Sequence, residues 1–344
     1  MNRTANRSLP SALQWKQAVA NYQSPDLRRS LWQIANTFIP YFALWYLMIR
    51  SLSVSYWLTL GLAVLAAGFL LRIFIFFHDC GHGSFFRSQR ANDTLGIITG
   101  LFTFTPYYYW RHTHAVHHAT VSDLDRRGIG DVWTMTLEEY ATAPWWRRLA
   151  YRVFRFPPFT FLIGPAIIFL LVQRIPLAPG NRRERNSVWW TDLALLGIAA
   201  LMSATIGLKA YALIQLPVII FAGMAGVWLF YVQHQFEGTY WERHERWDFV
   251  SASLVGSSYY RLPRVLQWFS GNIGFHHIHH LSPRIANYNL PRCYADNPVF
   301  QEVAPMTFVM SLAALRLHLW DEENQVMVGF AEAARSRLVF SRNV

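Results

Sequence analysis

Histidines are the residues of this sequence that point most directly to chemistry. The chain has 13 histidines, and nine of them fall in three windows of five residues. The windows are His78-Asp79-Cys80-Gly81-His82, His114-Ala115-Val116-His117-His118 and His276-His277-Ile278-His279-His280. Neutral imidazole is the commonest protein ligand for metal ions. This clustering therefore indicates a metal site.

The spacing within each window decides how many ligands it can offer. Residues three and four positions apart lie on one face of a helix, so the first window directs two imidazoles to one point and each of the others directs three. The eight spaced ligands are His78, His82, His114, His117, His118, His276, His279 and His280. Because one tetrahedral zinc uses at most four protein ligands, this count predicts two metal ions. Imidazole suits iron, zinc, copper and nickel, so ligand type alone does not name the metal.

Other roles for these histidines are structural contacts, pH sensing, or chance proximity in interfacial loops. Three windows with the same helical spacing favour metal binding over each of these alternatives. The di-iron proteins built on helix bundles use paired Glu and Glu-x-x-His motifs. This chain offers no such carboxylate set. An all-histidine site belongs to another class.

Further polar residues lie near the windows. His234 follows an apolar run and is a candidate ninth ligand, with an interfacial hydrogen-bonding role as the alternative. Carboxylates and amides commonly orient ligand imidazoles through the second ring nitrogen. The candidates for this supporting role are Asp79, His112, Asp123, Asp125, Asp131, Asn272 and His277. For the aspartates, the alternative is an exposed ion pair with a neighbour such as Arg126. His244 and His318 lack partners in this pattern and are expected to be ordinary surface residues.

Long apolar runs provide the elements that must position these residues. The composition is 53% apolar and 16% aromatic, and a run of about 20 apolar residues crosses roughly 30 Å of hydrocarbon. Four runs qualify, as two hairpins: about 31–48, 54–77, 191–208 and 211–231. Two shorter stretches, 95–106 and 159–172, are expected to be interfacial or re-entrant, because a single crossing would put the histidine windows in opposite compartments. The predicted fold class is an all-α integral membrane protein with four transmembrane helices and a cytoplasmic cap that carries the metal site.

These elements divide one membrane domain of 344 residues into five segments. We expect a cytoplasmic N-terminal segment (1–29), a first hairpin (30–77), a region with two windows (78–190), a second hairpin (191–233) and a region with the third window and a C-terminal surface helix over 305–330 (234–344). The first segment carries Arg3, Arg7, Lys16, Arg28 and Arg29 and has no apolar core typical of a signal peptide, so it is expected to stay inside.

The charge of the chain indicates which binding partners to expect, and its cysteine content indicates which redox compartment. The net charge of +11 is spread between the apolar runs, which favours anionic lipid headgroups over nucleic acid. Cys80 and Cys293 are too few for a disulfide framework and are compatible with a reducing compartment.

The windows and their flanking residues resemble the histidine boxes of membrane fatty acid desaturases, most closely the delta-12 or omega-6 acyl-lipid group and its bacterial relatives. The resemblance extends over 73–290, through Gly83-Ser84-Phe85-Phe86, Thr105-Pro106, Trp110-Arg111, the segment 124–132 and Gly271-Asn272-Ile273-Gly274. The first box has three residues between its histidines, as in acyl-lipid enzymes, and the third opens with histidine, unlike front-end desaturases. Ala286 departs from the family pattern, where proline is expected. No fused cytochrome motif, His-Pro-Gly-Gly, is present.

The resemblance implies two iron ions held by the eight spaced histidines, with His234 as the extra ligand. It implies a reaction in which dioxygen removes two vicinal hydrogens from a fatty acyl lipid and leaves a cis double bond. Electrons would come from an external donor, ferredoxin or a small b-type cytochrome. The expected location is the bacterial cytoplasmic membrane, with the active site on the cytoplasmic side. A di-iron hydroxylase or carotenoid oxygenase is the nearest alternative. A divalent-metal transporter is disfavoured, because its ligands should lie within spans.

Overall fold

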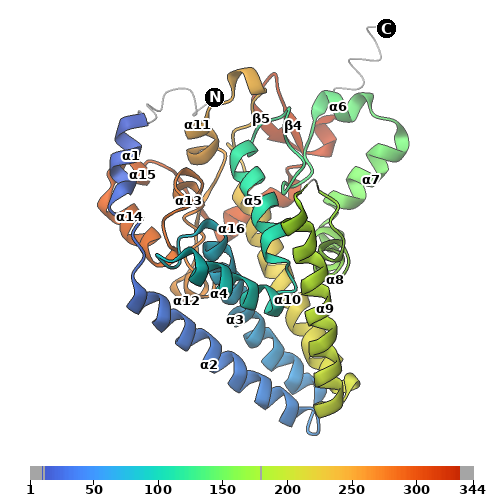
Figure 1. Cartoon of the computed structure of the whole chain (residues 1–344). Helices are drawn as coiled ribbons and strands as arrows, with labels where there is room; N and C mark the ends of the chain where they lie inside the picture. Colours follow the sequence, from blue (N-terminus) through green and yellow to red (C-terminus); the bar gives the residue numbers. More distant parts are fainter. Residues whose placement is uncertain (1–9, 11, 179, 334–344) are drawn as a thin grey trace.

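Four long helices form the lower part of the molecule, and shorter elements gather at one end of them (Figure 1). The computed structural model describes residues 10, 12–178 and 180–333. The long helices are α2 (Leu27–Ser51), α3 (Tyr56–His82), α9 (Arg182–Ile206) and α10 (Leu208–His234). Both helix pairs turn at the same end of the molecule, and their other ends lead into the cap (Figure 1). Two helical hairpins therefore support one cap, as the apolar runs predict.

Three of these helices, α3, α9 and α10, are long and apolar enough to cross a membrane. Helix α2 also has 25 residues, but its sequence is more polar and includes Gln33, Asn36 and Thr37. A fourth span exists by composition if α7 (Trp145–Arg155) and the segment Phe159–Arg174, bent by 67°, count as one broken crossing. Three of the four predicted spans are thus confirmed as apolar membrane-length helices. The remaining one, 31–48, forms a helix that packs along α3.

The helix ends explain where the box residues lie. Helix α3 continues to His82, five residues beyond the predicted end of the hairpin, and stops at Gly83 in the left-handed conformation (φ 67°). Helix α9 starts earlier than predicted, at Arg182, where Asn181 and Glu184 form a capping box. The first histidine box is therefore the last turn of a membrane helix and shares its rigidity.

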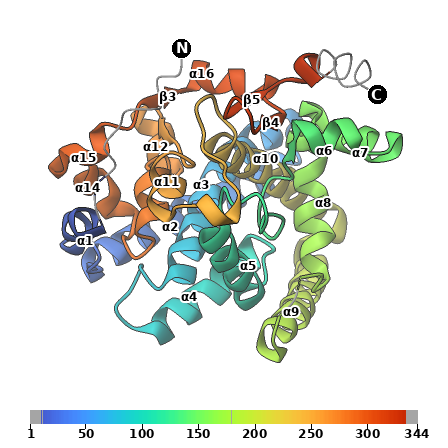
Figure 2. The same cartoon turned by 90° about the horizontal axis from the view of Figure 1, so that it is seen from above.

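The cap is built from short helices. The second box lies on α5 (Tyr107–Thr120) and the third on α13 (His276–Leu281). The other helices are α1 (Ala12–Ala20), α4 (Gln89–Phe102), α6 (Leu137–Thr142), α7 (Trp145–Arg155), α8 (Gly164–Leu170), α11 (Phe249–Leu254), α12 (Arg264–Phe269), α14 (Leu290–Asp296), α15 (Pro298–Gln301) and α16 (Phe308–Ser311). Seen from above, α4 lies beside α5 at one edge, and α9 lies at the lower edge of the view, where it packs against α5 and α10 (Figure 2).

Short strands correct the all-α expectation. The strands are β1 (Met135–Thr136), β2 (Tyr259–Arg261), β3 (Pro305–Thr307), β4 (Leu319–Asp321) and β5 (Val326–Val328), in the orders β1-β4-β5 and β2-β3. The surface helix predicted over 305–330 is wrong, because this stretch forms β3, α16, β4 and β5. Its partners explain the error: β3 pairs with β2 and β4 with β1, which lie far away in sequence.

The described part of the N-terminal segment is tied to the cap. Helix α1 buries Val19 in the same apolar cluster as Ile278 of the third box, and the Tyr22 hydroxyl donates to Asp296 Oδ2 at 2.8 Å. Arg3 and Arg7, expected to keep this segment inside, lie outside the described residues.

Candidate metal centre

The cap and the helix ends bring nine histidines to one place. They come from the end of α3, from α5, from the last residue of α10 and from α13, which meet where the hairpins join the cap (Figure 1). Their ring nitrogens form two groups in which all donor atoms lie within 4.8 Å of one another. One group is His78, His82, His114, His118 and His279, and the other is His117, His234 and His280. His276 joins the second group, since its Nε2 lies 3.0 Å from Nε2 of both His234 and His280.

The contacts between these rings fit cation binding better than hydrogen bonding. His118 Nε2 lies 3.2 Å from His114 Nε2 and 3.1 Å from His279 Nε2. A neutral imidazole carries a single N–H, so three converging nitrogens cannot all be paired with one another. Among the described residues, the buried Nε2 atoms of His82 and His117 have no hydrogen-bond partner. Two clusters of converging lone pairs are the donor set that two metal ions require.

Burial keeps these rings in the form that binds metal. Desolvation, with a smaller contribution from neighbouring imidazoles, lowers the pKa of the histidines outside the spans well below the usual value: His114, His118, His276, His279 and His280. Metal ligation requires the neutral imidazole. These five histidines are therefore ready to bind at neutral pH without losing a proton.

Two of the predicted supporting carboxylates lie against ligand histidines. Asp79 Oδ1 is 3.2 Å from His78 Nδ1, and Asp131 Oδ1 is 2.6 Å from His117 Nδ1. Each contact occupies Nδ1, which leaves Nε2 to face the centre. Asp79 is itself held, because its Oδ2 accepts from the backbone N (2.8 Å) and Nδ2 (2.9 Å) of Asn287. Sequence spacing did not single out Asn287, since the contact joins residues that are distant in the chain.

The other predicted supporting residues lie away from the ligand rings. Asp123 Oδ2 contacts His244 Nδ1 at 2.7 Å, and Asp125 Oδ1 accepts from Arg243 Nη1 at 2.8 Å. These two carboxylates hold the loop after α10 rather than a ligand. His244, expected to be an ordinary surface residue, is exposed and is the partner of Asp123.

The remaining candidates also lie outside both groups. His112 is partly exposed, with its Nδ1 3.6 Å from Glu184 Oε1. His277 is buried beside Tyr259 and Tyr294, and burial lowers its pKa to about 3. Asn272 donates to the carbonyl of Asn287 at 3.1 Å, one step from Asp79. His318, expected at the surface, is half-buried and stacks on Phe330 with 4.3 Å between ring centroids.

An apolar cavity of about 330 Å³ leads to the histidines. Its walls come from α3, α8 and α10, and His78, His114 and His276 also line it. The aliphatic and aromatic lining residues include Leu70, Leu71, Phe74, Ile168, Phe169, Ile219 and Phe230. An extended apolar ligand in this cavity would have its carbon atoms beside the metal-binding rings.

The contacts of Asp79 and Asp131 with the histidines lead to a first prediction about metal binding. Asp131→Asn and Asp79→Asn should each weaken metal binding by roughly 10- to 100-fold, the usual loss when the carboxylate that orients a metal-binding histidine is replaced. Iron content of the purified variants, measured by mass spectrometry after dialysis against graded chelator, checks this. Asp125→Asn is the matched control and should bind iron like the unchanged protein, because Asp125 contacts Arg243 instead of a ligand. Equal iron retention in all three variants would contradict the supporting role.

Comparisons with known proteins agree with this geometry. The family model described as fatty acid desaturase matches residues 55–309. A fatty acid desaturase of Bacillus subtilis is 47% identical over 312 residues, which cover 91% of this chain and 89% of the relative. An sn-1 oleoyl-lipid 12-desaturase of Synechocystis is 26% identical over 78% of this chain and 76% of the relative. A chloroplastic sn-2 acyl-lipid omega-3 desaturase (ferredoxin) of Helianthus annuus is 27% identical over 63% of this chain and 50% of the relative.

Proposed function

Because this chain belongs to the fatty acid desaturase family and is thus an oxidoreductase acting on fatty acids, we propose that it inserts a cis double bond into an acyl chain of a membrane lipid. The observation that carries the proposal is the apolar cavity that ends at nine converging histidines. An acyl methylene has no acidic proton and no leaving group, so acid, base or nucleophile chemistry alone cannot activate it. A redox metal site at the end of an apolar cavity meets that requirement.

We propose two iron ions as the resident metals. One would be held by His78, His82, His114, His118 and His279, and the other by His117, His234, His276 and His280. The irons would supply the reduction of dioxygen, which provides the oxidant for removing two hydrogens. Balanced with two electrons and two protons, the reaction consumes one dioxygen and yields one double bond and two waters.

The protein's own contribution is position and exclusion of water. Leu71 and Phe74 of α3 and Phe230 of α10 line an apolar space that a methylene chain can fill. This space lies close to His78 and His276. The depth to which the chain enters would determine which carbons lie beside the rings. The position of the double bond is therefore a property of the cavity's length and shape.

In more detail, we propose that the enzyme acts on acyl lipids and is of the delta-12 or omega-6 type. We place it in the bacterial cytoplasmic membrane, with its active site on the cytoplasmic side. The sequence resemblance and the relative named as an oleoyl-lipid 12-desaturase support this position of the double bond. Other relatives are named for the omega-3 position, so delta-12 stays a prediction.

Product analysis tests the proposed function. Lipids from a host that expresses this chain and contains oleate should accumulate a cis-9,12 diene, read by gas chromatography with mass spectrometry of derivatised esters. A cis double bond at another position would support the desaturase function and show that the delta-12 assignment is wrong. A hydroxylated product would instead support the alternative, a di-iron hydroxylase. The fraction in which the new double bond first appears distinguishes a glycerolipid substrate from an acyl carrier protein or coenzyme A substrate.

We also propose an external electron donor, ferredoxin or a small b-type cytochrome; the name of the Helianthus annuus relative indicates ferredoxin for that protein. The net charge of +11 would attract an acidic donor. With purified components, the reduction rate should fall several-fold as salt rises from about 0.01 M to 0.15 M, which shortens the Debye length from about 30 Å to about 8 Å. A rate independent of ionic strength would contradict electrostatic steering.

A further inference from the structure

Three arginines gather at a second pocket, on a different side of α3 from the apolar cavity. Arg29 of α2, Arg72 of α3 and Arg264 of α12 line this pocket of about 550 Å³, which we call the arginine pocket. The rest of its lining is amide and aromatic: Trp32, Gln33, Asn36, Gln267, Trp268, Asn272 and Tyr288. None of the Asp and Glu residues that the structure describes lines it. Within the described residues, none of the three guanidinium groups has a carboxylate within 4 Å; the Asp26 carboxylate instead accepts from the backbone N of Arg29 at 3.1 Å.

Arg72 is the unusual member of this set. Only 2% of it is exposed, and it lies within a helix that is apolar enough to span a membrane. Its Nε donates to Thr37 Oγ1 at 3.1 Å, its Nη1 donates to the Trp268 carbonyl, and its guanidinium lies 4.1 Å from the Trp268 ring centroid. All of these partners are neutral. A buried cation without an anion is costly, so a negatively charged ligand in the pocket would be stabilised.

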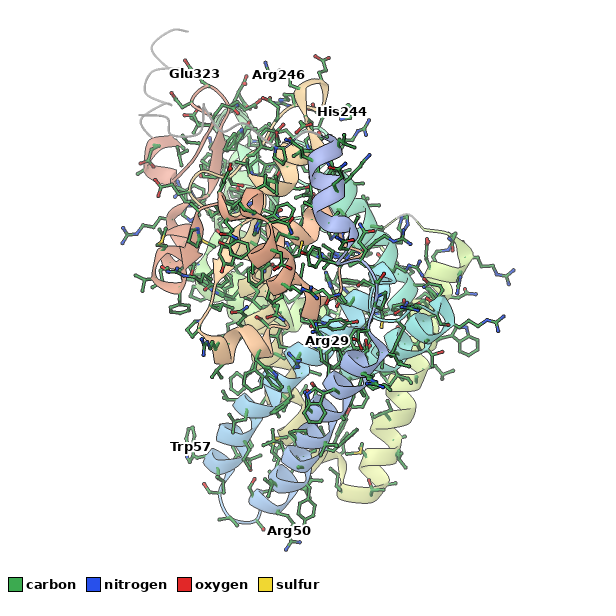
Figure 3. The ribbon with its side chains drawn as sticks, turned by 90° about the vertical axis from the view of Figure 1, so that its left-hand side faces the viewer. Arg29, Arg50, Trp57, His244, Arg246 and Glu323 are labelled. Carbon is green, nitrogen blue, oxygen red and sulfur yellow. The ribbon has the colours of Figure 1, made fainter. Side chains whose placement is uncertain are left out.

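The spacing of the arginines along α2 fits a pocket at the level of a lipid headgroup. Along α2, the distance from Arg29 to Arg50 is about 30 Å at 1.5 Å per residue, which equals the thickness of the hydrocarbon core. Figure 3 shows Arg29 where α2 meets the cap, and Arg50 and Trp57 at the opposite end of the hairpin. Exposed apolar side chains flank the pocket, including Trp32 (69% exposed) and Val265 (65%). Lipid chains can lie against these residues while a headgroup enters the pocket.

We propose that the arginine pocket binds the phosphate of an anionic phospholipid, at a site separate from the acyl cavity. The phosphate would accept hydrogen bonds from Arg29 and Arg264 at the rim of the pocket. Its negative charge would compensate the positive charge of the buried Arg72. The described lining offers no carboxylate to pair with the ammonium of a zwitterionic headgroup. A choline ammonium can also bind aromatic rings, but Trp268 and Tyr288 already face the guanidinium groups of Arg72 (4.1 Å) and Arg29 (6.0 Å). Both features favour phosphatidylglycerol over phosphatidylcholine.

Hydrogen bonds join this pocket to the metal centre. Gln33, which lines the pocket, donates to Asn287 Oδ1 at 2.9 Å, and Asn287 donates in turn to Asp79, the partner of His78. Asn272 lines the pocket and donates to the carbonyl of the same Asn287. A bound lipid would therefore hold α2, α12 and the loop after the third box in the arrangement that supports His78. We expect it to raise the thermal stability of the protein.

Native mass spectrometry of the purified full chain in neutral detergent tests the proposal, with dioleoylphosphatidylglycerol and dioleoylphosphatidylcholine as probes. The phosphatidylglycerol adduct should form preferentially and raise the unfolding midpoint by a few degrees. Arg29→Gln with Arg264→Gln should weaken that binding about 25-fold, since each basic contact contributes about fivefold. The Arg29→Lys, Arg264→Lys protein should keep most of the affinity. Arg50→Gln, at the opposite end of α2, is the matched control and should bind like the unchanged protein.

Three results would overturn the proposal. The first is equal affinity for phosphatidylglycerol and phosphatidylcholine. The second is that the double Gln variant binds phosphatidylglycerol as tightly as the unchanged protein does. The third is that inorganic phosphate alone raises the unfolding midpoint as much as phosphatidylglycerol does, which would assign the pocket to a soluble anion. Unchanged iron content of the double variant shows that it is folded. Because lipid binding is read without catalysis, these results leave the proposed desaturase function untouched.

Discussion

His279→Ala is expected to abolish desaturation and to reduce iron content, while the protein still inserts in the membrane. His279 lies at the centre of the five-histidine group: its Nε2 is 3.1 Å from His118 Nε2, and its ring centroid is 4.5 Å from that of His78. Loss of a partner outside the ligand set commonly weakens a metal site 10- to 100-fold. Removing a ligand from the centre should lower product formation by more than about a hundredfold.

The readouts for His279→Ala are iron per polypeptide, product by gas chromatography, and the amount of protein in the membrane fraction. Insertion should persist, because α13 lies in the cap and the apolar spans are unchanged. His112→Ala is the matched control. That side chain is partly exposed, and its ion-pair contact is with Glu184, outside the ligand groups. We expect its activity and iron content to stay within about twofold of the unchanged protein. If the His279→Ala protein binds two irons and forms a normal amount of product, His279 is not a metal ligand.

The donor set could be predicted from local spacing, but its division into two groups could not. The i, i+3, i+4 pattern on α5 brings His114, His117 and His118 toward the centre, as expected. Yet His117 belongs to a different group from His114 and His118. Which ring faces which partner depends on how α5 packs against α3, α10 and α13, and helical spacing within one segment carries no information about that packing.

The aspartates illustrate the same limit. Asp123, Asp125 and Asp131 are similar in sequence context, but only Asp131 reaches a ligand histidine. The path of the backbone decides this: Gly130 has a positive φ of 75° and passes so close to α5 that a Cβ there would lie 3.1 Å from His117 Cβ. This turn carries Asp131 beside His117. A glycine needed for such a close approach can be suspected from sequence, but its partner cannot be named.

For the fold, apolar run length predicted the helical hairpins, because that signal is local and strong. The short strands were missed because β1 pairs with β4 and β2 with β3 across long stretches of sequence, as Met135 does with Leu319. Strand β5 pairs with its neighbour β4, but each of the two has only three residues, too few for a clear alternating pattern. The arginine pocket was missed because its residues, too, are distant in sequence. Arg29, Arg72 and Arg264 look like unrelated basic residues until α2, α3 and α12 pack together.

Gly226→Leu is expected to impair the binding of long acyl chains without affecting the metals. Gly226 lines the apolar cavity on α10, and a Cβ at this position would lie 3.8 Å from Leu71 Cδ1, an ordinary contact. The backbone can therefore accept a side chain, which would occupy space that the substrate needs. Filling a packed apolar space costs typically 1–3 kcal/mol, so kcat/KM for the longest chains should fall about 5- to 150-fold. Shorter chains should lose less, which shifts the preference of the enzyme.

Competition between acyl lipids of different length, with products resolved by gas chromatography, measures that shift. Iron content should be unchanged, because Gly226 lies outside both histidine groups. Gly197→Leu adds the same side chain to α9, where nothing lies within 4 Å of the added Cβ, and it should keep the original rate and chain-length profile. If Gly226→Leu binds two irons and retains that profile as well, the substrate does not occupy this cavity. The regiochemistry would then have to be determined by another surface near the histidines.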